Sequence, residues 1–250
     1  MALKDEIKTE RKAYFKTATP KQKFLYLWEY YKVPAIIVTA IVIFSISFIY
    51  HKVTEPENLV NGMFLNIYSE LSDTSTVGLK QDFLESQDLD PAKYDVSFND
   101  SMNLVGNDTT DYDTRQAIWV QCGAGAIDFM VSPLNYITNY AYNDFYIDLR
   151  TVLSKEQIEK YGPYFLYVDG EVIKEINELS KDPDNNIKIQ LPDASHPEEM
   201  EDPIPVLIDM AECEKLKDIY SFTIETPVFG ILVNAKNVDM SIKVLDYLME

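Results

Sequence analysis

An unbroken apolar run divides the chain into two parts. Residues Val33 to Tyr50 read VPAIIVTAIVIFSISFIY and include no charged side chain. As a helix this run is about 27 Å long, at about 1.5 Å per residue, which matches the hydrocarbon core of a bilayer. A buried helix of a soluble protein normally keeps a polar face. The pattern therefore predicts one transmembrane helix at residues 33–50.

After this run, helical and strand patterns alternate. Short apolar runs and apolar positions with a period of two predict strands at residues 59–67, 94–98, 126–131, 204–208 and 226–233. Apolar positions three and four residues apart predict helices at residues 76–86, 114–122, 133–142, 155–161, 213–218 and 240–248. Such alternation is typical of an α/β domain with a parallel or mixed sheet. We expect the strand at 126–131 to lie in the middle of that sheet.

Two local motifs refine this pattern. Ser154 is followed three residues later by Gln157, which is the arrangement of a capping box and predicts a helix start at Lys155. The pair Asp169-Gly170 separates two apolar runs, and this pair is a strong signal for a tight turn. It predicts a β-hairpin over residues 165–176.

Charge predicts which side of the membrane each part occupies. Residues 1–32 hold eight Lys or Arg and four Asp or Glu, whereas the whole chain has a net charge of −19. Basic flanks are retained in the cytoplasm, so residues 1–32 are predicted to be cytoplasmic and the C-terminal part extracellular. A cleaved signal peptide would need a shorter apolar region and a small-residue site, and the following YHKVTEPENL offers none. The predicted organisation is a basic segment at 1–32, an anchor at 33–50, a linker at 51–58 and an α/β domain at 59–250.

The acidity of the outer part limits its partners. Phosphates would be repelled from most of its surface, so nucleic acid is not an expected partner. The acidity serves solubility, or it attracts cationic ligands, Ca²⁺ or a basic partner. Cys122 and Cys213 both belong to this part. They could form one disulfide or remain buried thiols.

Catalytic and metal motifs are missing from the sequence. The two histidines are His51, beside the apolar run, and His196, in a polar segment. We find no HExxH, no paired-cysteine zinc spacing and no glycine-rich phosphate loop. The expectation is therefore a protein that is not an enzyme and that needs no cofactor or metal.

One loop is rich in oxygen ligands. Residues Asn99 to Asp113 read NDSMNLVGNDTTDYD, and such oxygen-rich clusters suit Ca²⁺. The spacing does not match the EF-hand pattern, and a solvated turn that leads into a helix explains the same residues.

Several segments together resemble type II extracellular solute-binding proteins of ABC importers. The stretch GAGAIDFMVSPLNYITNYAYNDFYIDLRTVLSKEQIEKY, from Gly123, is similar to that family's order of small-residue turn, strand with an internal Asp, helix, Asp-Leu segment and short helix. The stretch PVFGILVNAKNVDMSIKVLDYL, from Pro227, is similar to the strand, Asn and helix near the family's end. The WEYYK before the anchor resembles membrane-anchored proteins of Gram-positive anaerobes.

The resemblance implies a periplasmic-binding-protein-like domain with one lobe or two, and a ligand site beyond the strand that carries Asp128. Tyr136 and Tyr140 lie where that family lines its cleft, so these three residues are the predicted ligand-binding residues. The implied function is extracellular binding of a small ligand or peptide by a membrane-anchored module. The alternative is an accessory or scaffold subunit of a cell-envelope complex, with a membrane protein as partner. A cleft between two lobes would favour binding, and a single lobe with an exposed tyrosine patch would favour the scaffold.

Overall fold

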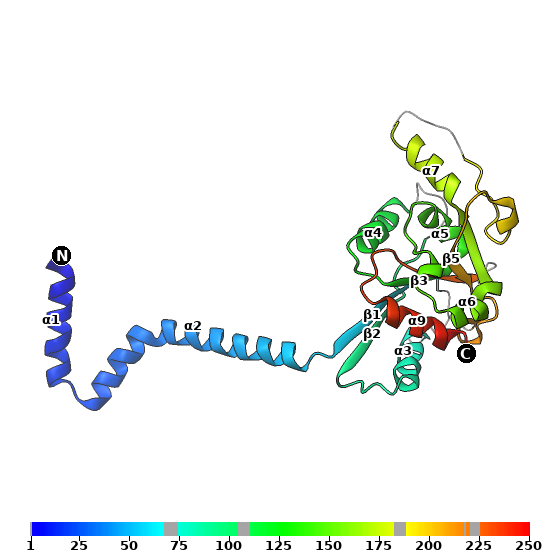
Figure 1. Cartoon of the computed structure of the whole chain (residues 1–250). Helices are drawn as coiled ribbons and strands as arrows, with labels where there is room; N and C mark the ends of the chain where they lie inside the picture. Colours follow the sequence, from blue (N-terminus) through cyan, green and yellow to red (C-terminus); the bar gives the residue numbers. More distant parts are fainter. Residues whose placement is uncertain (1, 68–74, 105–110, 183–188, 218, 221–225) are drawn as a thin grey trace. The chain divides into compact units, whose positions relative to one another are not determined.

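Figure 1 shows the computed structural model of the chain. It describes residues 2–67, 75–104, 111–182, 189–217, 219–220 and 226–250. The chain divides into two compact units, Met1–Glu55 and Pro56–Glu250.

The N-terminal unit consists of two helices, α1 (Ala2–Thr17) and α2 (Pro20–Thr54). Thr19 separates them because it is the N-cap of α2, with Gln22 completing a capping box and Pro20 in the first turn. The Tyr31–Lys52 portion of α2 is long and apolar enough to cross a membrane, and none of it is buried. Within it, the hydroxyl of Ser45 donates to the carbonyl of Ile41 at 2.8 Å, so this polar group is satisfied inside the helix.

The segment between the two units is shorter than the predicted linker at 51–58. Helix α2 continues to Thr54, and strand β1 already begins at Glu57. The hydroxyl of Thr54 donates to the Tyr50 carbonyl at 2.7 Å and supports this last turn. The apolar run ends at Tyr50, but the helix continues to Thr54, because each further residue adds a backbone hydrogen bond whether or not its side chain is apolar.

The C-terminal unit is built on one mixed six-stranded sheet in the order β2-β1-β3-β6-β5-β4. Its strands are β1 (Glu57–Phe64), β2 (Tyr94–Asn99), β3 (Phe129–Pro133), β4 (Phe165–Asp169), β5 (Pro203–Asp209) and β6 (Pro227–Ile231). Strand β1 is parallel to β2 and β3, whereas β6 is antiparallel to both β3 and β5, and β4 is antiparallel to β5. The predicted α/β class and mixed sheet are thus confirmed. The strand predicted at 126–131 is central as expected, but it runs from Phe129 to Pro133, so Asp128 lies just before it.

Helices cover both faces of this sheet (Figure 1). Side chains of α3, α6, α8 and α9 belong to one buried cluster, and those of α4, α5 and α7 belong to the other. The helices are α3 (Ser75–Ser86), α4 (Tyr112–Gly123), α5 (Leu134–Ala141), α6 (Lys155–Tyr161), α7 (Gly170–Leu179), α8 (Glu214–Lys217) and α9 (Val238–Leu248). Short 3-10 turns are η1 (Leu149–Thr151), η2 (Gly162–Tyr164) and η3 (Pro197–Glu199).

The strand period of two separates the two cores. In β3, Phe129 belongs to the α3–α9 side and Met130 to the α4–α5 side, and in β1 Phe64 and Met63 divide in the same way. Gly62 pairs with Phe129 in the register, and a Cβ on Gly62 would lie 2.1 Å from the ring of Phe129. A glycine is therefore needed where this ring crosses the neighbouring strand.

The predicted hairpin over residues 165–176 is wrong. Strand β4 ends at Asp169, and helix α7 begins at Gly170. The Asp169 side chain accepts from the backbone N–H of Glu171 and so caps the helix instead of forming a hairpin turn. Gly170 is needed for space and not for a turn, because a Cβ there would lie 2.4 Å from a carboxylate oxygen of Asp202.

The two cysteines do not form a disulfide. Both are free and buried. The thiol of Cys213 donates to the carbonyl of Leu248 at 2.9 Å, and Cys122 Sγ lies 3.8 Å from the sulfur of Met130. Burial raises the pKa of Cys122 to about 12, so this thiol is protonated at neutral pH.

Candidate functional site

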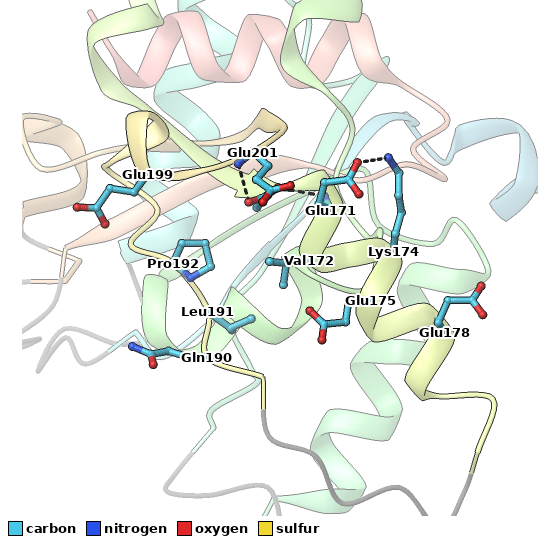
Figure 2. Close-up of a pocket in the computed structure, with 11 residues that line it drawn as sticks. Glu171, Val172, Lys174, Glu175, Glu178, Gln190, Leu191, Pro192, Glu199 and Glu201 are labelled. Atoms are coloured by element: carbon cyan, nitrogen blue, oxygen red, sulfur yellow. Dashed lines mark hydrogen bonds and ion pairs between the residues drawn. The ribbon is translucent and has the colours of Figure 1, made fainter.

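An acidic groove lies between helix α7 and the segment at residues 190–201 (Figure 2). Its volume is about 750 Å³, which is within the range of ligand pockets. Six carboxylates and one lysine are among its lining residues, which are Asp169, Glu171, Val172, Lys174, Glu175, Glu178, Gln190, Leu191, Pro192, Glu199 and Glu201. Its charge favours cations.

The buried carboxylate of Asp169 joins the two walls of the groove. Besides capping α7, it accepts from the backbone N–H of Glu201 at 2.9 Å and of Asp202 at 3.1 Å. The N–H of Gly170 donates to the Asp202 carbonyl at 2.8 Å, so the two chain segments approach each other closely here. The side chain of Asp169 is therefore a structural clamp at the carboxyl end of β4, where ligands of α/β folds tend to collect.

Hydrogen bonding keeps Asp169 ionised. Burial raises the pKa of this carboxyl, but the backbone N–H groups of Glu201, Glu171 and Asp202 outweigh burial and leave the pKa below its usual value. The clamp therefore persists at neutral pH.

The second wall of the groove is fastened to the edge of the sheet. The N–H of Tyr167 in β4 donates to the Ala194 carbonyl at 2.8 Å. Because β4 is an edge strand, this segment also covers backbone groups that would otherwise be open to pairing.

The groove combines an acidic rim with apolar patches. Val172, Leu191 and Pro192 are half-buried, and Val172 and Leu191 pack against the cluster beneath α4 and α5. On the rim, Lys174 pairs with Glu171 at 2.6 Å, whereas Glu175 and Glu178 are exposed along the same helix. Acidic groups beside apolar surface suit ligands such as lysine or arginine side chains, whose stems are apolar and whose ends are cationic.

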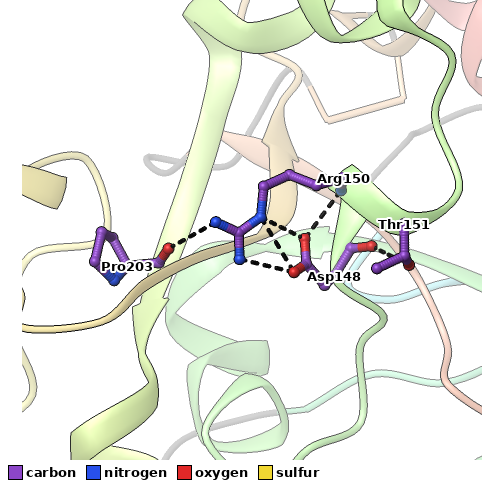
Figure 3. Close-up of polar contacts among 4 residues, drawn as sticks. All are labelled: Asp148, Arg150, Thr151 and Pro203. Carbon is purple, nitrogen blue, oxygen red and sulfur yellow. Dashed lines mark hydrogen bonds and ion pairs between the residues drawn. The ribbon is translucent and has the colours of Figure 1, made fainter.

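A second charged contact supports the same end of the sheet (Figure 3). Arg150 in η1 binds Asp148 through two nitrogens, with Nη2 to Oδ2 at 2.7 Å, and its Nη1 lies 3.5 Å from the carbonyl of Pro203. The hydrogen bonds that Arg150 donates to Asp148 raise the pKa of Arg150. This contact ties η1 to the beginning of β5, next to the Asp202 end of the groove.

The predicted ligand residue Asp128 is almost fully buried. Its carboxylate accepts from the backbone N–H of Asn61 at 2.8 Å, of Lys236 at 2.7 Å and of Asn237 at 2.9 Å. These donors belong to β1 and to the turn before α9. Backbone N–H groups thus satisfy the buried carboxylate of Asp128, which would be costly to bury without hydrogen bonds.

Tyr136 and Tyr140 lie on α5, one turn apart, as predicted. Tyr140 is buried, with its ring centroid 5.4 Å from that of Phe145 and 6.0 Å from that of Trp119. Tyr136 is half-buried against the same cluster. Neither these tyrosines nor Asp128 line the acidic groove, so the three predicted residues are not brought together there. Their role in ligand binding stays a prediction.

The described residues contain no group of three or more His, Cys, Asp or Glu placed to hold a metal ion. The proposed Ca²⁺ loop at Asn99 to Asp113 is only partly covered, since residues 105–110 lie outside the described residues. Of its described oxygen groups, the Asp100 carboxylate accepts from the hydroxyl of Thr76 at 2.5 Å, and the Asn99 side-chain oxygen accepts from the N–H of Ser101.

Sequence reasoning missed the groove. The available signal was the repeated glutamate on one side of α7, together with the acidic stretch at 198–202. The mistaken hairpin concealed it, because the helical spacing of Glu171, Glu175 and Glu178 has meaning only on a helix.

Comparison with models of protein families and with curated proteins finds no match. Two solved structures are similar at low TM-score. AgtB, a periplasmic binding protein from A. tumefaciens R10 in complex with agropinic acid, has a TM-score of 0.34 and 8 % identity over 77 % of this chain and 78 % of that chain. The periplasmic binding protein P5PA has a TM-score of 0.31 and 12 % identity over 78 % of this chain and 80 % of that chain. Both are periplasmic binding proteins, and at these scores neither ligand nor binding residues carry over to this chain.

Proposed function

We propose that this protein is a membrane-anchored binding module. Its extracellular domain binds a cationic small ligand or a basic peptide and does not catalyse a reaction. The observation that carries the proposal is the groove of about 750 Å³ with six carboxylates and apolar patches among its lining residues. Its electrostatic field favours cations, and its half-buried Val172 and Leu191 offer contacts for an aliphatic stem.

Anchoring is supported by helix α2. The whole Tyr31–Lys52 stretch is exposed although it is apolar, which is costly in water and favourable in a bilayer. The excess of Lys and Arg before it supports a cytoplasmic N-terminus. A signal sequence would share these properties, and an N-terminal tag distinguishes the two, because it stays on an anchored chain and is lost from a cleaved one.

The groove is tested with the full chain in detergent micelles. Fluorescence anisotropy is measured with labelled Lys- and Arg-containing peptides and with the same peptides carrying Gln at those positions. We expect the basic peptides to bind better, and Glu175→Gln with Glu178→Gln to weaken binding about tenfold. The matched control is Glu156→Gln with Glu159→Gln on α6, where the same loss of charge should leave binding unchanged. Equal loss in both double variants would reject the groove as the site.

An exposed apolar patch favours a second candidate, the accessory subunit of an envelope complex. Trp119 and Val233 are 44 % and 54 % exposed. Phe145 connects them, since its ring centroid is 4.4 Å from that of Trp119 and its carbonyl accepts from the N–H of Val233. Aromatic surface of this kind is typical of protein interfaces. Photo-crosslinking from position 119 in cells should capture a specific membrane protein if this candidate holds, and no discrete product if it does not.

A further inference from the structure

The bend between α1 and α2 forms a small pocket inside the N-terminal unit. The pocket is about 300 Å³, at the lower end of ligand-pocket volumes, and is lined by Lys12, Phe15, Tyr26, Leu27 and Tyr31. The two helices are held together by aromatic rings. The ring centroid of Tyr26 lies 5.2 Å from that of Tyr14 and 5.5 Å from that of Phe15.

The pocket lies at the depth of lipid headgroups if α2 spans a membrane. Tyr31 is both a lining residue and the first residue of the apolar span. Tyr26 precedes it by only about 8 Å along the helix axis. The headgroup layer on each side of the hydrocarbon core is roughly 5 to 7 Å deep. The pocket therefore opens at the bilayer surface and not deep in the cytoplasm.

The chemistry of the pocket suits an anionic headgroup with part of its chain. Lys12 is exposed and supplies an ammonium group to the lining. The amphipathic rings of Tyr26 and Tyr31 line the pocket beside it, and such rings favour the headgroup level of a bilayer. The side chains of Phe15 and Leu27 form the apolar part of the pocket lining. Over residues 1–32 the sequence holds eight Lys or Arg and four Asp or Glu, so the segment that carries the pocket is basic overall.

Exposed apolar side chains also lie on α2 just before the span. Phe24 and Trp28 are 64 % and 57 % exposed and stack at 6.3 Å between ring centroids. Such rings beside lysines favour the interface of a bilayer.

We propose that the bend between α1 and α2 binds the headgroup of an anionic phospholipid in the pocket lined by Lys12, Tyr26 and Tyr31, next to the membrane span. The proposal rests on the membrane anchoring proposed above. It adds a lipid-specific site, whereas anchoring alone requires no particular lipid.

The test uses Trp28 as a reporter in the full chain. Trp119→Phe removes the other tryptophan, and the protein is reconstituted in nanodiscs of equimolar phosphatidylcholine and phosphatidylglycerol. Bromine atoms, which quench tryptophan, are placed on the acyl chains of one lipid at a time. We expect brominated phosphatidylglycerol to quench Trp28 roughly two- to fivefold more than brominated phosphatidylcholine.

Lys12→Gln should lower this ratio towards one, and Lys12→Arg should preserve it. Lys52→Gln, at the other end of α2, is the matched control and should leave the ratio unchanged. Excess inorganic phosphate at constant ionic strength should also leave it unchanged, and a collapse of the ratio would identify free phosphate as the ligand and overturn the lipid site.

Equal quenching by the two lipids, or a ratio that Lys12→Gln does not alter, would overturn the lipid site while leaving the anchor intact. Quenching by neither lipid would place Trp28 beyond the reach of the acyl chains and would overturn the lipid site, whereas loss of an N-terminal tag from the chain would reject the anchor.

Discussion

The carboxylate of Asp128 accepts a hydrogen bond at 2.8 Å from the backbone N–H of Asn61, which lies in β1. The same carboxylate accepts from Lys236 and Asn237, in the turn before α9. One buried charge thus connects the first strand of the domain, the beginning of its central strand and its last helix. This geometry is typical of a structural carboxylate.

Loss of the Asp128 carboxylate should destabilise the domain. In Asp128→Leu, three backbone N–H groups lose their acceptor, and we expect a loss of about 3–5 kcal/mol of unfolding free energy. Asp128→Asn keeps one acceptor oxygen and should cost less, about 1–3 kcal/mol. Urea unfolding followed by circular dichroism measures both, with Asp144→Asn at an exposed position as control. An Asp128 variant as stable as the parent would show that the Asp128 carboxylate is dispensable for stability.

Gly62 and Gly78 offer a matched pair of substitutions. A Cβ at Gly62 would lie 2.1 Å from the fully buried ring of Phe129, so Gly62→Ala should cost about 1–3 kcal/mol through overpacking. At Gly78, inside α3, an added Cβ would meet nothing within 4 Å. Gly78→Ala should therefore stabilise the domain by about 0.5–1 kcal/mol. Thermal unfolding checks both, and the same sign for the two variants would contradict the assigned contact with Phe129.

Stability should fall at alkaline pH. Burial raises the pKa of Cys122 from 9.0 to about 12. Burial, then the charges of Asp82 and Cys213, raise the pKa of Tyr247 from 10.0 to about 12. Between these values the unfolded chain releases protons that the folded chain keeps, so stability is full below about pH 9 and is lost towards pH 12.

Unfolding by urea at a series of pH values measures this loss. Tyr247→Phe removes one of the titrating groups and should make the decline above pH 10 shallower. The same decline in the parent and in Tyr247→Phe would contradict the burial of Tyr247.

Labelling in intact cells should reveal the topology. Cys122 and Cys213 are buried, so an impermeant thiol reagent reports on introduced cysteines only. We expect Gln190→Cys, which is exposed, to react in intact cells. Lys8→Cys should react only after permeabilisation, because positive residues are retained in the cytoplasm. The reverse pattern would invert the orientation and contradict the proposed extracellular groove.

Local patterns carried much of the fold prediction. The capping box of Ser154 and Gln157 begins α6 as expected, since a cap needs only neighbouring residues. The mixed sheet also followed from the alternation of strands and helices. The hairpin at Asp169-Gly170 failed for the opposite reason. The same pair also suits a helix start, where Asp169 caps α7. The same carboxylate binds the backbone of residues 201 and 202, which lie far along the chain and are not visible in the local pattern.

The sequence by itself determined the apolar span, the charge asymmetry around it and the α/β class, because composition and periodicity are properties of neighbouring residues. Tertiary structure alone decided the positions of Tyr140 and Asp128, since burial depends on what packs from elsewhere in the chain. It also decided the groove. There the clamp of Asp169 on residues 201 and 202 places the glutamates of α7 opposite a segment some twenty residues away, a pairing that no local pattern encodes.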